Sequence, residues 1–423
     1  MKVLQISTSD LAHGAGIAAY NLHLGLQEIG CISKMLVAEK FSNNPDIYTA
    51  KPVPNTKIEK ILSKSQTLYN RALNQFLPQN IHSLISIDWS RNSLLQEADI
   101  IHIHNLHWHD NNFSILNLKK ICMLKPVIWT LHDMWPVTGH CIYSFDCERW
   151  RIGCGKCPDL NSYLPLIVDT TSALCKIKKN EYAKSIFTVI TPSQWLANIV
   201  NESPLFTEHK IVRIPYGIDN EIYKPHIKRI AKEVLGIQST EQKVILYCAN
   251  DWSSSNKGYT YFESAILSLN ELYSNCILIG FGKGDFSPEV KKRFTTVTFG
   301  YVGSPQLKAL LYSSADFFIF PTIADNLPNV VLESMACGTP VVSFSVGGIP
   351  DMIQHMKTGY LARLKDVNDL AQGIKTLLND EIRLGMSLEC VQAINKNFTL
   401  RVQASRCLQI YHEEIQSRKS RLM

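Results

Sequence analysis

The chain has 423 residues, which is too long for one hydrophobic core and predicts two domains. A composition of 45% hydrophobic and 19% charged residues is that of a globular protein, and no stretch is apolar over the length of a membrane span. The formal net charge of +6 is mild and no nucleic-acid-binding motif accompanies it, so we do not expect nucleic acid as a partner.

The N-terminus lacks the pattern of a targeting segment. The apolar run of Met1 to Ser7 is too short for a signal peptide, and Asp10 interrupts any extension of it. We therefore expect a cytoplasmic protein whose twelve cysteines are mostly reduced thiols.

A glycine pair follows the first predicted strand, Lys2 to Ser7. Gly14 and Gly16 lie in a predicted turn before an amphipathic helix from about Ile17 to Ile29. Glycines at such a place let the backbone come close to an anion at the helix N-terminus. The alternative is a tight turn with no ligand.

Residues 57–76 predict an amphipathic helix with a basic face. Such a helix suits weak, reversible contact with an anionic membrane surface. The alternative is a helix that packs on its own domain and leaves its basic face in water.

Histidines gather on the next two predicted strands. His102 and His104 share one face of the strand from Ala98 to His104, because the side-chain period of a strand is two. A metal cluster of these histidines with His107 and His109 is one interpretation. We favour a metal-free element that lines a cleft, which is what the family resemblance described below implies.

His132 ends the strand predicted at Pro126 to Leu131. A histidine at the carboxyl end of a parallel strand faces the ligand crevice. The alternative is a buried histidine whose hydrogen bonds are satisfied within the core.

An unusual insert follows, with cysteines spaced C-x5-C-x6-C-x2-C. Four thiolates can bind one Zn²⁺ tetrahedrally and fold a loop that has little core of its own. Free or redox-active thiols and disulfides are the other interpretations, and the sequence leaves all three open. The four residues are Cys141, Cys147, Cys154 and Cys157.

The first half closes with Ile214 to Asp219, shortly followed by Pro225, and we place the domain boundary there. In the second half, a strand at Val244 to Ala249 leads to Lys257 and Gly258. A further strand at Cys276 to Gly280 runs into a glycine-rich turn that contains Gly280 and Gly282. These glycines suit a nucleotide contact, and a turn alone would need them too.

Two carboxylates lie in a segment whose other residues are mostly apolar and are expected in the hydrophobic core. An apolar run at Ala315 to Pro321 predicts a buried strand, and a helix is predicted from about Asn329 to Cys337. Asp325 precedes that helix and Glu333 lies on it. One interpretation makes Asp325 an N-cap and Glu333 a solvated surface residue. The other places both at the ligand-binding edge of an open α/β sheet.

The string from Asp325 to Val342 resembles the E-x7-E signature of retaining GT-B glycosyltransferases of family 4, with Asp325 in place of the first glutamate. The similarity extends over most of the chain. It implies an α/β fold of two Rossmann-like domains facing across a cleft, residues 1–217 and 218–400. The last helix, about 401–423, should cross back to the first domain. A similar cysteine-bearing loop occurs in a subgroup of this family.

The resemblance also implies roles for the residues. Asp325 should hold hexose hydroxyls, Glu333 should hold ribose hydroxyls, His132 should lie beside the reacting sugar and Lys257 should bind the donor diphosphate. In the family an arginine usually precedes the Lys-Gly pair by a few residues, and here Asp251 or Trp252 stands in its place. Further donor contacts are implied at Gly14, Gly16, Gly280, Gly282, Asn326, Leu327 and Asn329.

The function implied is that of a retaining hexosyltransferase in cell-surface polysaccharide synthesis. It would move a sugar from a nucleotide diphosphate donor to a glycan or lipid-linked acceptor, in the cytoplasm or peripherally at the inner face of the membrane. No cofactor is expected for catalysis, and a structural zinc stays open. The alternatives are a catalytically weak or inactive sugar-nucleotide-binding protein and a GT-B-fold sugar-nucleotide epimerase.

Overall fold

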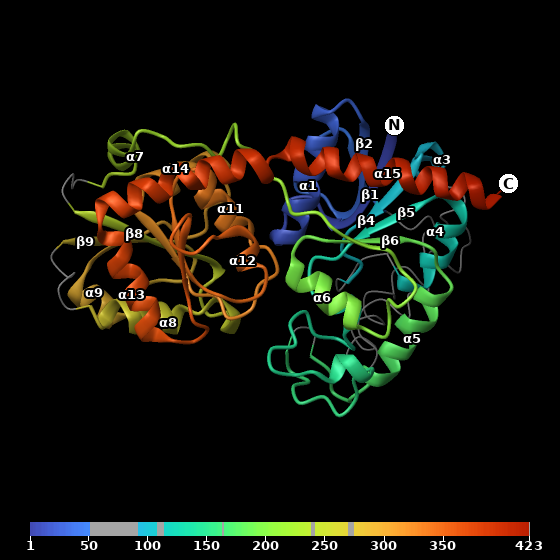
Figure 1. Cartoon of the computed structure of the whole chain (residues 1–423), viewed down its shortest axis with the longest axis horizontal. Coiled ribbons are helices and arrows are strands. Elements are labelled where there is room, and N and C mark those ends of the chain that lie inside the picture. The colour runs from blue at the N-terminus through green and yellow to red at the C-terminus, as the bar shows by residue number, and fades with distance from the viewer. Residues whose placement is uncertain (51–91, 108–113, 163–164, 238–241, 270–274, 423) are drawn as a thin grey trace, which may run out of the picture. The chain divides into compact units, whose positions relative to one another are not determined.

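The computed structural model describes residues 1–50, 92–107, 114–162, 165–237, 242–269 and 275–422 (Figure 1). The chain divides into two compact units. Unit 1 comprises residues 1–217 and 403–423, and unit 2 comprises residues 218–402. None of the helices in the described ranges combines the length and the apolar composition that crossing a bilayer requires.

Unit 1 is built on a parallel sheet whose seven described strands run in the order β3-β2-β1-β4-β5-β6-β7. The strands are β1 (Lys2–Ser9), β2 (Ile32–Glu39), β3 (Ile47–Thr49), β4 (Ile100–Ile103), β5 (Val127–Thr130), β6 (Thr188–Thr191) and β7 (Ile211–Arg213). The helices are α1 (His13–Glu28), α3 (Ser93–Glu97), α4 (Leu118–Leu124), α5 (Thr171–Ala183) and α6 (Gln194–Glu202), with short 3-10 turns η2 (Ile115–Asn117), η3 (Trp135–Val137) and η4 (Arg149–Ile152).

Unit 2 repeats the design, with described strands in the order β10-β9-β8-β11-β12-β13, all parallel. They are β8 (Lys243–Asp251), β9 (Cys276–Lys283), β10 (Thr295–Thr298), β11 (Phe317–Phe320), β12 (Val341–Phe344) and β13 (Gly359–Ala362). Its helices are α7 (Lys228–Val234), η5 (Ser255–Lys257), α8 (Tyr259–Leu267), α9 (Pro288–Arg293), α10 (Pro305–Ser314), α11 (Asn329–Ala336), α12 (Ile349–Met352), α13 (Val367–Leu378) and α14 (Asp380–Asn397).

Strand β11 shows why such runs form the core. All four of its side chains are at most 1% exposed, because a parallel sheet is covered on both faces and its strands can be apolar throughout. The predicted two Rossmann-like α/β domains are confirmed.

The last helix, α15 (Leu400–Leu422), belongs to unit 1 from residue 403 onward. In Figure 1 it runs along β1, β4 and β5. Ala404, Cys407 and Tyr411 pack there in one apolar cluster with Val3 and Leu22. Since these residues come from both ends of the chain, the core of unit 1 is closed by its C-terminal segment.

Two local predictions are wrong. Helix α1 begins at His13 rather than near Ile17, so Gly14 and Gly16 lie in its first turn. Gly16 is there because a Cβ would stand 2.5 Å from Ser9 Oγ. Gly280 and Gly282 lie within strand β9, which continues to Lys283, and not in a turn.

Candidate functional site

The topology of unit 2 marks where a ligand is expected. The chain runs from β8 outward to β9 and β10 and then returns to β11 on the other side of β8, so the strand order reverses between β8 and β11. Open α/β sheets bind ligands beyond the carboxyl ends of their strands at such a point. Lys257 follows β8 and Asp325 follows β11, so both lie at this switch point.

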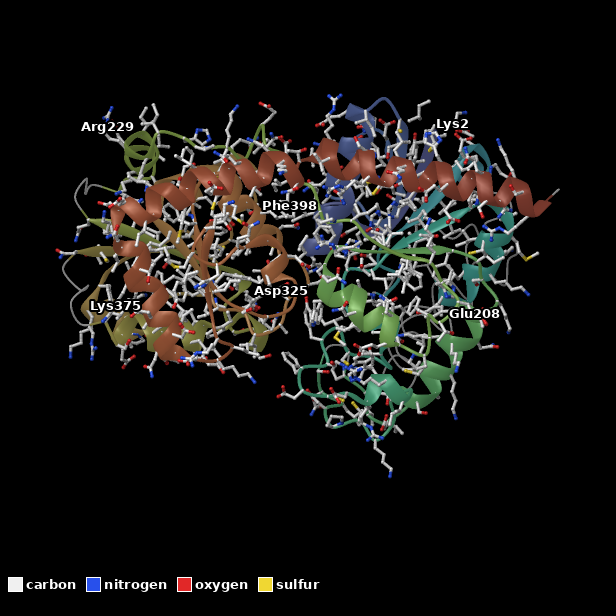
Figure 2. All side chains as sticks on the ribbon, in the orientation of Figure 1. Lys2, Glu208, Arg229, Asp325, Lys375 and Phe398 are labelled. Atoms are coloured by element: carbon white, nitrogen blue, oxygen red, sulfur yellow. The ribbon has the colours of Figure 1, made fainter. Side chains whose placement is uncertain are left out.

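Lys257 and Asp325 form an ion pair, with Nζ 2.6 Å from Oδ2 and Asp325 only 7% exposed. Asn256 ties the two loops together. Its side chain donates to the Ala324 carbonyl at 3.1 Å, and its own carbonyl accepts from the Ile323 amide at 2.8 Å. Asp325, labelled in Figure 2, is therefore joined to the Lys257 loop both by the ion pair and by the hydrogen bonds of Asn256.

Two glycines allow the loops to approach this closely. Gly258 has φ +71°, and a Cβ there would stand 1.9 Å from the Pro321 carbonyl oxygen. Gly347 has φ +57°, and its Cβ would stand 1.9 Å from the Asp325 carbonyl oxygen. Only glycine fits at either position, so the close approach of the loops around Asp325 requires glycine at both residues.

Glu333 lies on α11 and is 2% exposed, which is rare for a carboxylate. Its Oε2 accepts a hydrogen bond from the Tyr312 hydroxyl at 3.0 Å. The Tyr223 hydroxyl also bonds with Glu333. The pKa of Tyr223 is raised, mainly because the residue is buried and secondly because the Glu333 charge lies nearby. The interpretation of Glu333 as a solvated surface residue is therefore wrong.

The helix start agrees with the prediction, but its cap does not. Pro328 occupies the N-cap position of α11, so the interpretation of Asp325 as the N-cap is wrong. The three predicted donor contacts beside it are all buried. They are Asn326, Leu327 and Asn329, at 2%, 3% and 8% exposure. The helix ends at Ala336 with Cys337 as its C-cap, and the next residue, Gly338, has the left-handed φ of +74° that is common just after a helix.

Trp252 packs against Gly280 within β9 and against Gly284 just after it, while a Cβ at Gly282 would stand 1.7 Å from the Ala249 carbonyl oxygen. The Trp252 ring is 5% exposed, and its Nε1 donates to the Phe281 carbonyl at 3.0 Å. A Cβ at Gly280 would stand 2.4 Å from this ring, and one at Gly284 would stand 2.4 Å from it too. Of the two residues that stand where an arginine was expected, Trp252 is therefore a core residue, and the glycines have a packing reason that needs no nucleotide.

Unit 1 has its own switch point between β1 and β4. Gly14 and Gly16 follow β1, and His104 follows β4. His132 follows β5, the next strand of the sheet. The structure therefore brings these four predicted residues to one edge of unit 1, whereas the carboxylates and Lys257 belong to unit 2.

His104 and His132 form a buried hydrogen-bonded chain. His104 Nδ1 lies 3.0 Å from His132 Nε2, and His132 Nδ1 lies 2.6 Å from the Tyr216 hydroxyl. When the Gln5 side-chain amide is oriented so that both its oxygen and its nitrogen have hydrogen-bond partners, the nitrogen donates to His104 Nε2 at 2.8 Å. His104 then donates to His132 and His132 donates to Tyr216, which fixes the tautomer of both rings.

Burial keeps these histidines neutral. It lowers the pKa of His132 to about 4 and that of His102 to about 3, and it holds the pKa of His104 well below its usual value. His102 stacks on His104 with ring centroids 4.5 Å apart, which confirms that both share a face. His102 also bonds with Thr130 and Tyr411, the latter from α15.

Two buried charged residues that hold the segment after His132 in place were not identified from the sequence. Lys178 of α5 is fully buried, and its Nζ donates to the carbonyls of Trp135 at 2.6 Å and Thr138 at 2.8 Å, while burial lowers its pKa to about 8. The sequence feature that could have identified Lys178 is a lysine among apolar residues at helical spacing. Asp133 pairs with His107, with Oδ2 3.0 Å from Nε2. Burial alone would raise the pKa of Asp133, but the pairing with His107 and the other hydrogen bonds to its carboxylate lower it.

The cysteine insert lies between η3 and α5. Its four cysteines line one small pocket, and all twelve cysteines of the chain are free of disulfides. Within the described ranges, no three or more His, Cys, Asp or Glu side chains are arranged to hold a metal ion. The basic helix predicted at residues 57–76 and His109 lie outside the described residues.

A family model described as Glycosyl transferases group 1 matches residues 242–380, most of unit 2. The chain is 27% identical over 267 residues to a putative colanic acid biosynthesis glycosyl transferase, WcaC, of Escherichia coli, covering 60% of this chain and 62% of that one. It is 30% identical over 296 residues to an uncharacterized glycosyltransferase of Methanocaldococcus jannaschii, covering 68% and 67%. The chain thus spans about two thirds of these relatives or slightly less.

A solved structure of HepE from Anabaena in complex with UDP-glucose has the same fold. It superposes with a TM-score of 0.62 at 15% identity and covers 99% of this chain and 100% of that one. Together with the paired parallel sheets and the returning helix, these matches show that the chain belongs to the group 1 glycosyltransferases and has the GT-B fold.

Proposed function

We propose that this protein is a retaining glycosyltransferase that moves a hexose from a nucleotide diphosphate donor to a glycan or lipid-linked acceptor in cell-surface polysaccharide synthesis. The observation that carries the proposal is the convergence of Lys257, Asp325 and buried Glu333 around the switch point of unit 2. The UDP-glucose bound by HepE and the colanic acid role given to WcaC support a nucleotide-sugar donor and a polysaccharide product. We expect the reaction on the cytoplasmic side, with membrane contact only peripheral.

Each group has a distinct task in this proposal. A carboxylate has about four acceptor positions. Glu333 uses two for Tyr312 and Tyr223, which leaves two for the paired hydroxyls of a ribose. Asp325 would bind hexose hydroxyls. Lys257 and the N-terminal end of the α11 dipole would neutralise the diphosphate.

The chemistry needs no second nucleophile. The bond between the anomeric carbon and the diphosphate oxygen breaks, and the bond to the acceptor oxygen forms on the same face of the sugar. The departing diphosphate takes the acceptor proton. Stabilising the negative charge on the leaving group is then the main task of the site, which we assign to Lys257.

One observation favours a second candidate, a catalytically weak or inactive sugar-nucleotide-binding protein. Asp251 or Trp252 stands where the family has its arginine, Trp252 is buried and hydrogen-bonded in the core, and Lys257 is already paired with Asp325. A second cation at about 4 Å in an effective dielectric near 20 would contribute roughly 4 kcal/mol per unit charge before desolvation.

A donor screen on the full chain tests the proposal. Binding stabilises a folded protein, so one of the UDP-, GDP- and ADP-linked sugars should raise the melting temperature. With that donor, addition of a glycan or lipid-linked acceptor should release the nucleoside diphosphate and give an α-linked product from an α-linked donor. Binding without hydrolysis or transfer indicates the inactive protein, and a new sugar nucleotide without acceptor indicates an epimerase. Inversion at the anomeric carbon contradicts the retaining mechanism.

A further inference from the structure

The backbone around Cys154 is fixed in an unusual conformation beside α5. Gly153 to Lys156 all have positive φ, and Cys154 itself has φ +58°. Such conformations are costly and persist only where the surroundings hold them. The Gly155 amide donates to Oγ1 of Thr171, the first residue of α5, at 2.9 Å. The turn of the cysteine insert is therefore tied to this helix.

The Cys154 sulfur accepts hydrogen bonds from two sides. The Gly139 amide donates to Cys154 Sγ at 3.2 Å, and the thiol of Cys175 on α5 donates to the same sulfur. Donors directed at a sulfur favour its thiolate form. Cys157 has the opposite arrangement, because its own thiol donates to the Asp159 carbonyl at 3.3 Å and so keeps its proton. With these sulfurs engaged, and with no group of ligands gathered around one point in the described residues, the insert does not fit a zinc ion.

A buried ammonium lies near the Cys154 sulfur. Lys178 is 0% exposed, and its Nζ bonds with the carbonyls of Trp135 and Thr138 and lies 3.6 Å from the centroid of the Trp135 ring. These partners carry no net charge, and a buried cation is costly unless an anion lies near it. The sulfurs of Cys175 and Cys154 are the groups that most favour the charged form of Lys178. Since Cys175 donates its proton to Cys154, a thiolate at Cys154 supplies the negative charge.

The titration of the thiols agrees with these contacts. The hydrogen bond from Cys175 is the main reason that the pKa of Cys154 is lowered to about 7, although burial opposes it. Burial raises the pKa of Cys157, and it raises the pKa of Cys141 to about 12. Of these three thiols of the insert, Cys154 therefore has the largest thiolate fraction at neutral pH, and the thiolate is the reactive form. Cys154 is also partly exposed and lines the pocket of the insert, so a small oxidant can reach it.

We propose that Cys154 is a site of oxidation by hydrogen peroxide and that Cys175 then forms a disulfide with it. The Cys154 thiolate attacks one peroxide oxygen, the O–O bond breaks, hydroxide leaves, and the sulfur becomes a sulfenic acid. The Cys175 sulfur then attacks Cys154 Sγ, the S–O bond breaks, and the hydroxyl leaves as water with the Cys175 proton. The two sulfurs lose two electrons in total, and the peroxide gains them.

The disulfide would link the insert covalently to α5. Two sulfurs already in hydrogen-bond contact have only a short distance to close before they reach the S–S bond length of about 2 Å. This modification goes beyond the proposed transfer reaction and does not depend on it.

Oxidation of the full chain tests the proposal. The reduced protein is treated with a small molar excess of hydrogen peroxide at neutral pH, the remaining thiols are blocked, and the disulfides are mapped by mass spectrometry of unreduced peptides. We expect the Cys154–Cys175 disulfide to form first and a thiol reductant to reverse it. A different first disulfide, no oxidation at Cys154, or a bound zinc ion that protects the thiols of the insert would each overturn the proposal.

Two variants separate the roles of the thiols. Cys175→Ser should leave a sulfenic acid at Cys154 that dimedone traps, because the second thiol is gone. Cys157→Ser is the matched control, since Cys157 lines the same pocket but donates its proton to Asp159, and it should form the disulfide at the wild-type rate. Dimedone on Cys157 instead of Cys154, or loss of the disulfide in Cys157→Ser, contradicts the assignment. Thermal unfolding checks that each reduced variant is folded, and if Cys175→Ser is not, the disulfide map of the wild type decides.

Discussion

Lys257 and Glu333 are the residues on which donor binding should depend most strongly. Loss of a charge-assisted contact costs about 1.5–3 kcal/mol, so Lys257→Ala should lower kcat/KM by about 100-fold. Glu333→Gln should weaken donor binding by about tenfold or more, because the amide offers fewer acceptor positions to a ribose. Steady-state kinetics with the stabilising donor measure both.

The matched control is Lys283→Ala. Lys283 is a lysine of the same unit whose side chain is 82% exposed. It should leave kcat/KM within a factor of two or so, as surface substitutions usually do. Equal losses at Lys257 and Lys283 would remove the special role of the switch-point lysine.

Gly280 should matter for stability rather than for the donor. A Cβ there would stand 2.4 Å from the Trp252 ring, so Gly280→Ala should destabilise unit 2 by about 1–3 kcal/mol through overpacking. Gly303→Ala is the control, because its Cβ would meet only Tyr301 at an ordinary 3.6 Å. Urea unfolding compares the two. A stable Gly280→Ala protein with weakened donor binding would instead support the predicted nucleotide contact.

At the scale of the elements, the ends of β4 and β5 make unit 1 sensitive to acid. An unfolded histidine has a pKa near 6.5. The pKa of folded His102 is about 3 and that of His132 about 4, and the pKa of His104 lies well below 6.5. Between pH 6.5 and 4 the unfolded chain therefore binds protons that the native unit does not, so stability falls as the pH falls through this window. Three such groups give a slope of up to about 4 kcal/mol per pH unit.

Urea unfolding of unit 1 at several pH values between 7.5 and 4.5 measures this slope. His102→Gln should make it shallower, since one of the three groups is gone. His412→Gln should leave it unchanged, because His412 is exposed on α15. A stability that is constant over this range would show that the histidine chain is protonated in the native state.

The sequence predicts features that depend on residues close together in the chain, and it misses contacts between residues far apart in the chain. Strand β11 and helix α11 could be predicted because an apolar run and the stop at Gly338 are local signals. The packing of Trp252 on the glycines of β9 could not, since it joins separate strands. The Tyr312–Glu333 bond was missed for the same reason, because a sequence shows a carboxylate but not the hydroxyl that will meet it.

At the scale of the whole molecule, α15 makes unit 1 depend on the end of the chain. Beyond its apolar contacts, Glu414 accepts from Thr188 at 2.6 Å, and Gln403 accepts from the Gly217 amide at 2.8 Å. A chain that ends at residue 402 should therefore lose the cooperative unfolding of unit 1 and aggregate, because the apolar cluster is opened to water.

The control is a chain that ends at residue 418, which keeps these contacts and removes only the exposed helix end. It should remain soluble with an unchanged transition, as judged by size-exclusion chromatography and thermal unfolding. If the chain that ends at residue 402 behaves in the same way, α15 is not part of the core of unit 1.

The account as a whole requires that the switch point of unit 2 holds a nucleotide sugar. Isothermal titration of the full chain with the donor that stabilises it tests this most directly, with wild type, Glu333→Gln and Lys283→Ala compared at one salt concentration. We predict binding by wild type and Lys283→Ala with the same Kd, and a Kd raised by about tenfold or more in Glu333→Gln. An equal Kd for all three proteins, or no binding of any nucleotide sugar by the wild type, would contradict the account.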